Sequence, residues 1–268
     1  MKPETTPLDL LLSDLGREES ATAALDRFLK LPPDQRSHLL EESEALREAL
    51  VRPLAHPRRT LQRRAAGALV ALLPKSPALE ARLLLALTNS DQRLRWGAAW
   101  TLGQGENPPA AIWPAVREAM ALDDGDQRWA ASRLACKLAF ENPGIALALD
   151  EAAGSAPAVL RKMALYCLRD LGTPGAATVA RRALRDDDSG VRLAALAVLA
   201  RLGDPAHASA VAECLEHDPE PGIRRAAAAT LGRFGPAAGE VRALLLRVTE
   251  GAEPALRRAA RLALGLAP

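Results

Sequence analysis

The chain has 268 residues, of which 49% are hydrophobic and only 3% aromatic, and its formal net charge is +2. This composition favours helices that pack through small side chains over one large aromatic core. The nearly neutral charge argues against a global attraction to nucleic acid or to a membrane surface, although a local basic patch is compatible with it.

The first 56 residues have a helical pattern that lies outside the repeat described below. We expect frayed residues over 1–7 and helices near 8–15, 20–31 and 34–50, separated by prolines. The apolar stretch from Leu8 to Leu12 is broken by Asp9, which argues against a signal peptide. Nowhere in the chain do about eighteen apolar residues follow one another, so we predict no membrane contact. Residues 1–56 are predicted to be an N-terminal helical cap.

From residue 57 onward one apolar stripe recurs every 31 to 33 residues. Counting from the first residue of each stripe, offset 4 is Ala in all seven copies, offset 8 is Leu in six and offset 1 is Arg in six. A period of this size indicates a solenoid of stacked helices, with residues 57–268 as the repeat region. The stripes begin at Leu61, Leu94, Gln127, Leu160, Val191, Ile223 and Leu256.

A second helix is expected between successive stripes, and most of these helices begin at or near a proline. We call the helices that carry the stripe B helices and the helices between them A helices. Two antiparallel helices in each repeat define an all-α architecture. The A helices are expected at about 77–88, 109–122, 143–153, 174–185, 205–216 and 236–249.

Two segments, DDDSGVRLAALAVLARLGDP (186–205) and EPGIRRAAAATLGRFG (220–235), resemble HEAT repeats of the short class first noted in bilin lyases. The resemblance covers about residues 57–268. It implies a right-handed α-solenoid of about seven two-helix HEAT-like repeats, with the B helices lining the concave surface. The class includes scaffolds, lyase subunits, DNA glycosylases and a di-iron hydroxylase, so the resemblance leaves function open.

The arginine column at offset 1 lies at the border of the apolar stripe, where its guanidinium can reach loop carbonyls or the preceding acidic residue. In proteins with this motif such residues form a ladder between repeats, and we favour that structural role. Phosphate binding by the column is the alternative. The ladder residues are Arg95, Arg128, Arg161, Arg192, Arg224 and Arg257.

Offsets 2, 5, 6 and 9 lie away from the stripe and are expected to face solvent or a partner. Four of the five Trp and Tyr residues occupy these offsets in three adjacent repeats, close to several cations. We therefore predict one contiguous patch on the concave face. Its residues are Trp96, Trp100, Trp129, Arg133, Lys162, Tyr166, Arg63 and Arg169.

Exposed aromatic rings beside arginine are typical of protein-binding hot spots, and the same combination suits base stacking beside phosphate contacts. We predict a non-catalytic scaffold that binds a protein partner. The runner-up is a DNA- or RNA-binding protein, including one that resembles a DNA glycosylase, on the same face. Two other interpretations stay open: the rings cover neighbouring alanine-rich helices, or they line a small-ligand pocket.

The sequence offers little for catalysis. It has no His-Glu pair, no C-x-x-C pair, no G-x-S-x-G elbow and no glycine-rich phosphate loop, so we predict no catalytic residue, metal or cofactor. Base excision would need a carboxylate beside the aromatic patch, and the carboxylates at that level of the chain are Asp123, Asp124, Asp126 and Asp170.

The three cysteines and the C-terminal helix complete the predictions. The cysteines lie in helical segments and suit a reducing cytoplasm, as buried small side chains or, in the minority interpretation, as reactive thiols. The helix that starts at Pro254 has an apolar surface that favours self-association with a second copy, unless the preceding A helix covers it. The cysteines are Cys136, Cys167 and Cys214.

Overall fold

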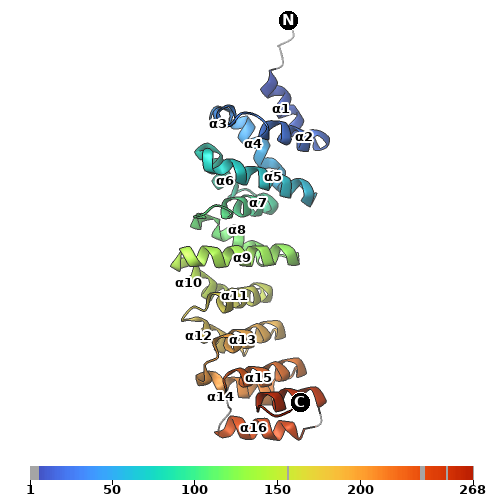
Figure 1. Cartoon of the computed structure of the whole chain (residues 1–268), viewed down its shortest axis with the longest axis vertical. Helices are drawn as coiled ribbons and strands as arrows, with labels where there is room; N and C mark the ends of the chain where they lie inside the picture. The colour runs from blue at the N-terminus through green and yellow to red at the C-terminus, as the bar shows by residue number, and fades with distance from the viewer. Residues whose placement is uncertain (1–5, 156, 236–238, 252, 268) are drawn as a thin grey trace. The chain divides into compact units, whose positions relative to one another are not determined.

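A computed structural model describes residues 6–155, 157–235, 239–251 and 253–267, and every regular element within these ranges is a helix (Figure 1). The chain forms two compact units, residues 1–119 and 120–268, and each is described by itself. The boundary between them lies inside the repeat region, so the predicted domain boundary after residue 56 stays a prediction. No helix among the described residues is long and apolar enough to cross a membrane.

Unit 1 contains the N-terminal helices and the first two B helices, α5 and α7. Its elements are α1 (Pro7–Leu15), α2 (Glu18–Leu29), α3 (Pro33–Glu42), α4 (Glu44–Val51), the 3-10 turn η1 (Arg52–Ala55), α5 (Arg59–Leu72), η2 (Leu73–Lys75), α6 (Pro77–Ala86), α7 (Gln92–Gly103), η3 (Ala110–Ile112) and α8 (Trp113–Ala119).

Two expectations for the N-terminal segment are wrong. The helix expected over 34–50 is divided into α3 and α4, because Ser43 adopts an extended backbone and its hydroxyl accepts a hydrogen bond from the backbone N–H of Leu46 (3.1 Å). The fraying expected over 1–7 does not reach Pro7, since Thr6 and Asp9 form a reciprocal capping box at the start of α1. Residues 1–5 lie outside the described residues.

Unit 2 contains the other five B helices, α9, α11, α13, α15 and α17. Its elements are α9 (Gly125–Glu141), α10 (Pro143–Ala152), α11 (Ala158–Leu171), α12 (Ala176–Ala183), α13 (Ser189–Leu202), η4 (Pro205–His207), α14 (Ala208–His217), α15 (Pro221–Arg233), α16 (Gly239–Thr249) and α17 (Pro254–Ala263). The A helix expected over 236–249 corresponds to α16, and residues 236–238 lie outside the described residues.

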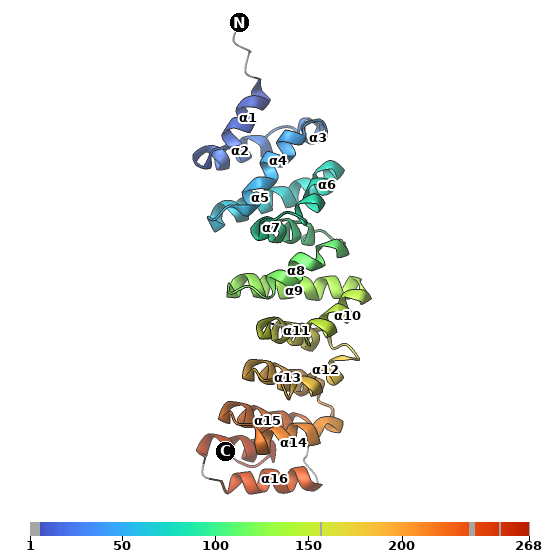
Figure 2. The ribbon, with the colours of Figure 1, turned by 180° about the vertical axis from the view of Figure 1, so that it is seen from behind.

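The B helices of unit 2 stack on one another in chain order. Helices α9, α11, α13 and α15 lie side by side in both views (Figures 1 and 2), and each packs against the next. The A helices α10, α12 and α14 pack against the B helices that follow them. This arrangement confirms the predicted all-α solenoid of two-helix repeats.

The alanine column at offset 4 is the centre of the repeat core. Each of the seven alanines is at most 1% exposed, from Ala65 in α5 to Ala260 in α17. A methyl group lets the neighbouring helices approach closely, whereas a larger side chain would separate them. Helices α11 and α13 end at Gly172 and Gly203, whose positive φ angles of 63° and 68° are accessible to glycine at little cost.

Candidate partner-binding surface

The arginine ladder has one repeated geometry. In every ladder arginine, Nη1 donates a hydrogen bond to the carbonyl oxygen six residues earlier in the chain, in the loop that precedes its helix. Each of these loop carbonyl oxygens thus accepts a hydrogen bond from a charged donor. The six bonds are Arg95 to Asn89 (2.7 Å), Arg128 to Leu122 (2.6 Å), Arg161 to Ser155 (3.2 Å), Arg192 to Asp186 (2.8 Å), Arg224 to Asp218 (2.8 Å) and Arg257 to Gly251 (3.2 Å).

Carboxylates of the following repeat complete the ladder. Arg161 donates two hydrogen bonds of 2.7 Å to Asp186, and Arg192 donates bonds of 2.7 Å and 3.0 Å to Asp218. Burial alone would raise the pKa of Asp186, but the bonds from Arg161, the backbone N–H of Asp188 and the charges of Arg161 and Arg192 together hold the pKa below its ordinary value. Guanidinium groups occupied in this way have little capacity left for phosphate, which supports the structural interpretation of the ladder.

The acidic residues three positions before the stripes divide into two roles: Glu253 pairs with the ladder residue Arg224 (3.5 Å), whereas Asp91 and Asp188 act as helix caps. Asp188 accepts a hydrogen bond from the backbone N–H of Val191 (3.0 Å) and caps α13, and Asp91 caps α7 by accepting from the N–H of Arg93 (2.8 Å). The ladder partners are carboxylates one repeat further along the chain. Both sets of acidic residues are present in the sequence, but their spacing alone does not show which set forms ion pairs with the ladder arginines.

Two further side chains donate to loop carbonyls in the same way, although the repeat register did not include them in the predicted ladder. Gln62, the exception at offset 1, donates from Nε2 to the carbonyl oxygen of Leu54 (2.7 Å). Arg47 donates to the carbonyl oxygens of Leu40 and Glu41. Arg47 follows its helix cap, Ser43, by four residues, as Arg192 follows Asp188, and this spacing is the signal that could have found it.

The expectation that offset 5 faces outward is wrong. The residue at offset 5 is buried in six copies. Successive residues turn by about 100°, so offset 5 lies on the flank of the stripe. Within each unit the B helices pack against their neighbours, with α5 against α7 and α9, α11, α13, α15 and α17 in succession, and this packing covers the flank. The buried residues are Ala66, Ala99, Ser132, Leu165, Leu196 and Ala228.

Offsets 2, 6 and 9 of the five B helices in unit 2 define what we call the B-helix face. No Asp or Glu occurs at these fifteen positions, whereas five of them hold Lys or Arg. The other ten positions hold aromatic, apolar or small residues. Glu253, which precedes α17, is a carboxylate at the edge of the face and pairs with Arg225 (2.9 Å). The five cations are Arg133, Lys162, Arg169, Arg225 and Arg258.

A stacked aromatic pair joins α9 and α11. Trp129 is 49% exposed, and its ring stacks on that of Tyr166 with centroids 5.5 Å apart and planes inclined by 20°. The guanidinium carbon of Arg169 lies 5.1 Å from the centroid of Tyr166, and Nε of Arg169 donates to Asp170 (2.8 Å). Trp129, Tyr166, Arg169 and the half-buried Lys162 are four predicted residues on two adjacent helices. Arg133, exposed on α9, is the fifth.

The remaining predicted residues belong to unit 1. Arg63 on α5 is exposed and Trp100 on α7 is half-buried, but Trp96 is only 7% exposed. The prediction that Trp96 faces outward is therefore wrong. Helix α7 packs against the turn η1, which lies outside the repeat register. Offset 2, which faces outward in a regular repeat, is therefore covered in α7. The single contiguous patch predicted across three repeats stays a prediction.

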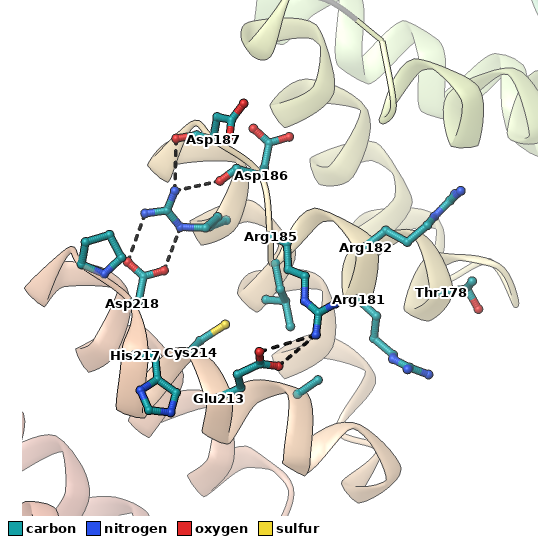
Figure 3. A pocket seen from close by; sticks show the side chains of 14 residues that line it. Thr178, Arg181, Arg182, Arg185, Asp186, Asp187, Glu213, Cys214, His217 and Asp218 are labelled. Atoms are coloured by element: carbon teal, nitrogen blue, oxygen red, sulfur yellow. Dashed lines mark hydrogen bonds and ion pairs between the residues drawn. The ribbon is translucent and has the colours of Figure 1, made fainter.

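A pocket, which we call the A-helix pocket, lies between the A helices α12 and α14 (Figure 3). Arg185 points toward Glu213, with Nη2 and Oε2 3.2 Å apart, and Arg192 is held by Asp218 and the carbonyls of Asp186 and Asp187. Most charged groups in this pocket therefore satisfy one another, and it offers a mixture of both charges. The B-helix face, in contrast, has one sign of charge and exposed aromatic rings.

Among the described residues, no group of three or more His, Cys, Asp or Glu side chains could hold a metal ion. Asp170, which the sequence placed near the aromatic residues, is paired with Arg169.

Comparisons with known proteins agree with the fold. Residues 145–232 match the HEAT-repeat family model. A crystal structure of Kap121p bound to Nup53p is similar with a TM-score of 0.64 at 14% identity, over 96% of this chain and 33% of that one. Importin beta is similar with a TM-score of 0.55 at 17% identity, over 94% of this chain and 39% of that one. A search of curated proteins finds no match.

These likenesses define the class of protein. The repeat geometry, the family match and the structural neighbours together make the chain a HEAT-like repeat protein. The chain spans about a third of the length of the Kap121p structures that it resembles, and at this level of identity the likeness shows the fold alone.

Proposed function

We propose that this protein is a non-catalytic scaffold whose B-helix face binds an acidic segment of a protein partner. The observation that carries the proposal is the exposed Trp129 stacked on Tyr166, with Arg169 at the edge of the pair. Aromatic anchors ringed by cations favour an apolar side chain of the partner at the centre and carboxylates around it. The structural neighbours support a protein partner, because Kap121p has been crystallised with Ste12p and with Nup53p.

The charge of the face defines the chemistry of the partner. Carboxylates are missing from its fifteen positions and five of them hold a cation, so the face favours an acidic segment over a basic one. Beyond the aromatic pair, α13 and α15 carry Ala197, Ala200 and Ala229, whose small side chains leave room for a peptide backbone. The ladder arginines, which a nucleic acid would need for regular phosphate contacts, are occupied within the protein.

Fluorescence anisotropy with labelled probes tests this function on the full chain. The probes are an acidic peptide with a central Leu, the same peptide with a central Gly, and an oligothymidine. We expect the first probe to bind most tightly and Trp129→Ala to weaken it by about tenfold or more. Leu147→Ala, a truncation of an exposed residue on the A helix α10, serves as the control and should change little.

Two results would contradict the proposal. One is preferential binding of oligothymidine with an affinity that falls log-linearly and steeply with salt, which would favour the nucleic-acid alternative. The other is equal binding of both peptides by the wild type and by Trp129→Ala.

Two accompanying predictions belong to the same proposal. We propose a cytoplasmic location, which the three free cysteines favour. We also propose that α17 supports self-association, because Leu262 and Leu266 are exposed on and just after this helix. Light scattering of the wild type and of a Leu262→Glu variant tests the second point: equal masses at all concentrations would exclude it.

A further inference from the structure

Two free cysteines face each other across the contact between α9 and α11. Cys136 on α9 is half-buried, and Cys167 on α11 is 1% exposed. The Sγ–H of Cys136 donates to the backbone carbonyl of Cys167 (3.9 Å), and the Sγ–H of Cys167 donates to the carbonyl of Ser132 on α9 (3.5 Å). Each thiol therefore reaches the backbone of the opposite helix.

The two thiols also interact with each other, and the pair is chemically asymmetric. A side-chain hydrogen bond from Cys167 lowers the pKa of Cys136, against the effects of burial and of Asp170, and Arg169 assists. The same hydrogen bond raises the pKa of Cys167, and burial adds to the increase. Cys136 is thus both the more accessible thiol and the better nucleophile, since the thiolate is the reactive form. Cys167 is placed to resolve an adduct on it.

We propose that Cys136 and Cys167 form a vicinal dithiol that low-molecular-weight disulfides oxidise to an intramolecular disulfide between α9 and α11. The Cys136 thiolate attacks one sulfur of the reagent, forms a mixed disulfide and releases one reagent thiol. Cys167 then gives up its proton and displaces the second reagent thiol. Two electrons pass from the dithiol to the reagent, which leaves as two thiols, and one protein disulfide remains.

The position of this pair gives the reaction a structural consequence. The same two helices carry Trp129 and Tyr166, and Cys167 is the next residue after Tyr166. A disulfide requires the sulfur atoms to approach to about 2 Å, so the cross-link would draw together the two helices that carry the aromatic pair. The inference concerns the thiols themselves and does not depend on the proposed partner.

Oxidation of the full chain by glutathione disulfide tests the inference. We expect the intact mass to fall by two hydrogen atoms, one thiol to stay free at Cys214, and non-reducing peptide mapping to join the peptides of Cys136 and Cys167. The variant Cys214→Ser should behave in the same way. Burial raises the pKa of Cys214 to about 11, which makes it a suitable unreactive control. Cys136→Ser should lose the reaction, and Cys167→Ser should stop at a stable glutathione adduct on Cys136.

A second measurement avoids any dependence on how the Cys136 and Cys167 variants fold. Phenylarsine oxide bridges two neighbouring thiols, so the native wild type and Cys214→Ser should each bind one equivalent and lose two titratable thiols. Three outcomes would overturn the inference: a stable glutathione adduct on Cys136 in the wild type, a disulfide that includes Cys214 or a second chain, and failure of both reagents to react.

Discussion

At the residue scale, Arg192 on α13 connects its own loop to the next repeat. Its Nε and Nη2 hold both carboxylate oxygens of Asp218, while Nη1 donates to the carbonyls of Asp186 and Asp187. Both partners of the ion pair are buried. Breaking a buried ion pair from one side leaves the other charge without compensation, which is costly even where the intact pair contributes little net stability.

We therefore expect Arg192→Ala to lower the free energy of unfolding by about 3 kcal/mol. Arg257→Ala is the matched control. The structure gives Arg257 a carbonyl hydrogen bond of 3.2 Å, to Gly251, and its loss should cost about 1 kcal/mol or less. Urea denaturation followed by circular dichroism measures both changes. Equal and small losses would contradict the view that the ladder holds neighbouring repeats together.

Asp150 on α10 is a carboxyl group whose charge we expect to destabilise the fold, in contrast to the ion-paired Asp218. Its Oδ1 is buried without a hydrogen-bond partner, and burial raises the pKa of the carboxyl although Arg182 opposes the shift. A carboxyl whose folded pKa exceeds its unfolded value destabilises the fold when it is ionised. This penalty is present at neutral pH and disappears as the pH falls below the unfolded pKa of about 3.9.

Asp150→Asn should accordingly stabilise the protein at pH 7 by up to about 1 kcal/mol, because it removes the desolvated charge. The difference from the wild type should shrink as the pH is lowered from 7 toward about 4. Thermal melts across this range measure the effect. A variant that melts at a lower temperature than the wild type at pH 7 would mean that the carboxylate has a stabilising partner.

At the element scale, two helical glycines show how closely the helices of unit 1 approach each other. A Cβ added at Gly97 on α7 would lie 2.7 Å from Cβ of Leu54 in η1, whereas one added at Gly67 on α5 would meet nothing within 4 Å. Gly67 therefore has no packing reason to be glycine, and Gly97 has a clear one.

Alanine substitutions at these two sites should change stability in opposite directions. Gly67→Ala should raise the free energy of unfolding by roughly 0.5–1 kcal/mol through helix propensity and unfolded-state entropy. Gly97→Ala should lower it by about 1–3 kcal/mol, because η1 must move away from α7. Urea denaturation of the two single variants decides the matter, and a stabilising Gly97→Ala would mean that this contact is looser than described.

Most elements could be predicted from the sequence because each repeat buries the same stripe. The alanines at offset 4 fixed the register of all seven B helices, and every one of them is buried. The failures lie where a local contact overrides the pattern. Ser43 divides a helix by capping its second half, and η1 covers the region of α7 around Gly97, next to which Trp96 is buried. A helical wheel contains neither kind of information.

At the scale of the whole molecule, the chemistry of the B-helix face follows from which offsets are covered by the stack. The sequence predicted the aromatic and basic residues of α9 and α11, but their stacking geometry and the burial of offset 5 depend on contacts between repeats. Such contacts link residues about 30 positions apart, and the sequence pattern shows their period without showing which side chains meet.

Charge reversal on the two sides of unit 2 separates the B-helix face from the A-helix pocket. Arg133→Glu places a carboxylate beside the aromatic pair, so the affinity for the acidic peptide should fall by about fivefold or more at low salt. Arg181→Glu makes the same charge change on the A helix α12 and should have little effect. Anisotropy titrations at two salt concentrations measure both, and an equal loss in the two variants would indicate binding through net charge alone.

The most direct test of the central claim is to locate the bound peptide on the full chain. An acidic peptide with a photoreactive group beside its central Leu can be cross-linked, and the attachment sites can be mapped by mass spectrometry. We predict cross-links on α9 and α11, around Trp129 and Tyr166, that an excess of unlabelled peptide removes. Cross-links confined to α12 and α14, around Arg185 and Glu213, would contradict the assignment of the B-helix face as the partner-binding surface.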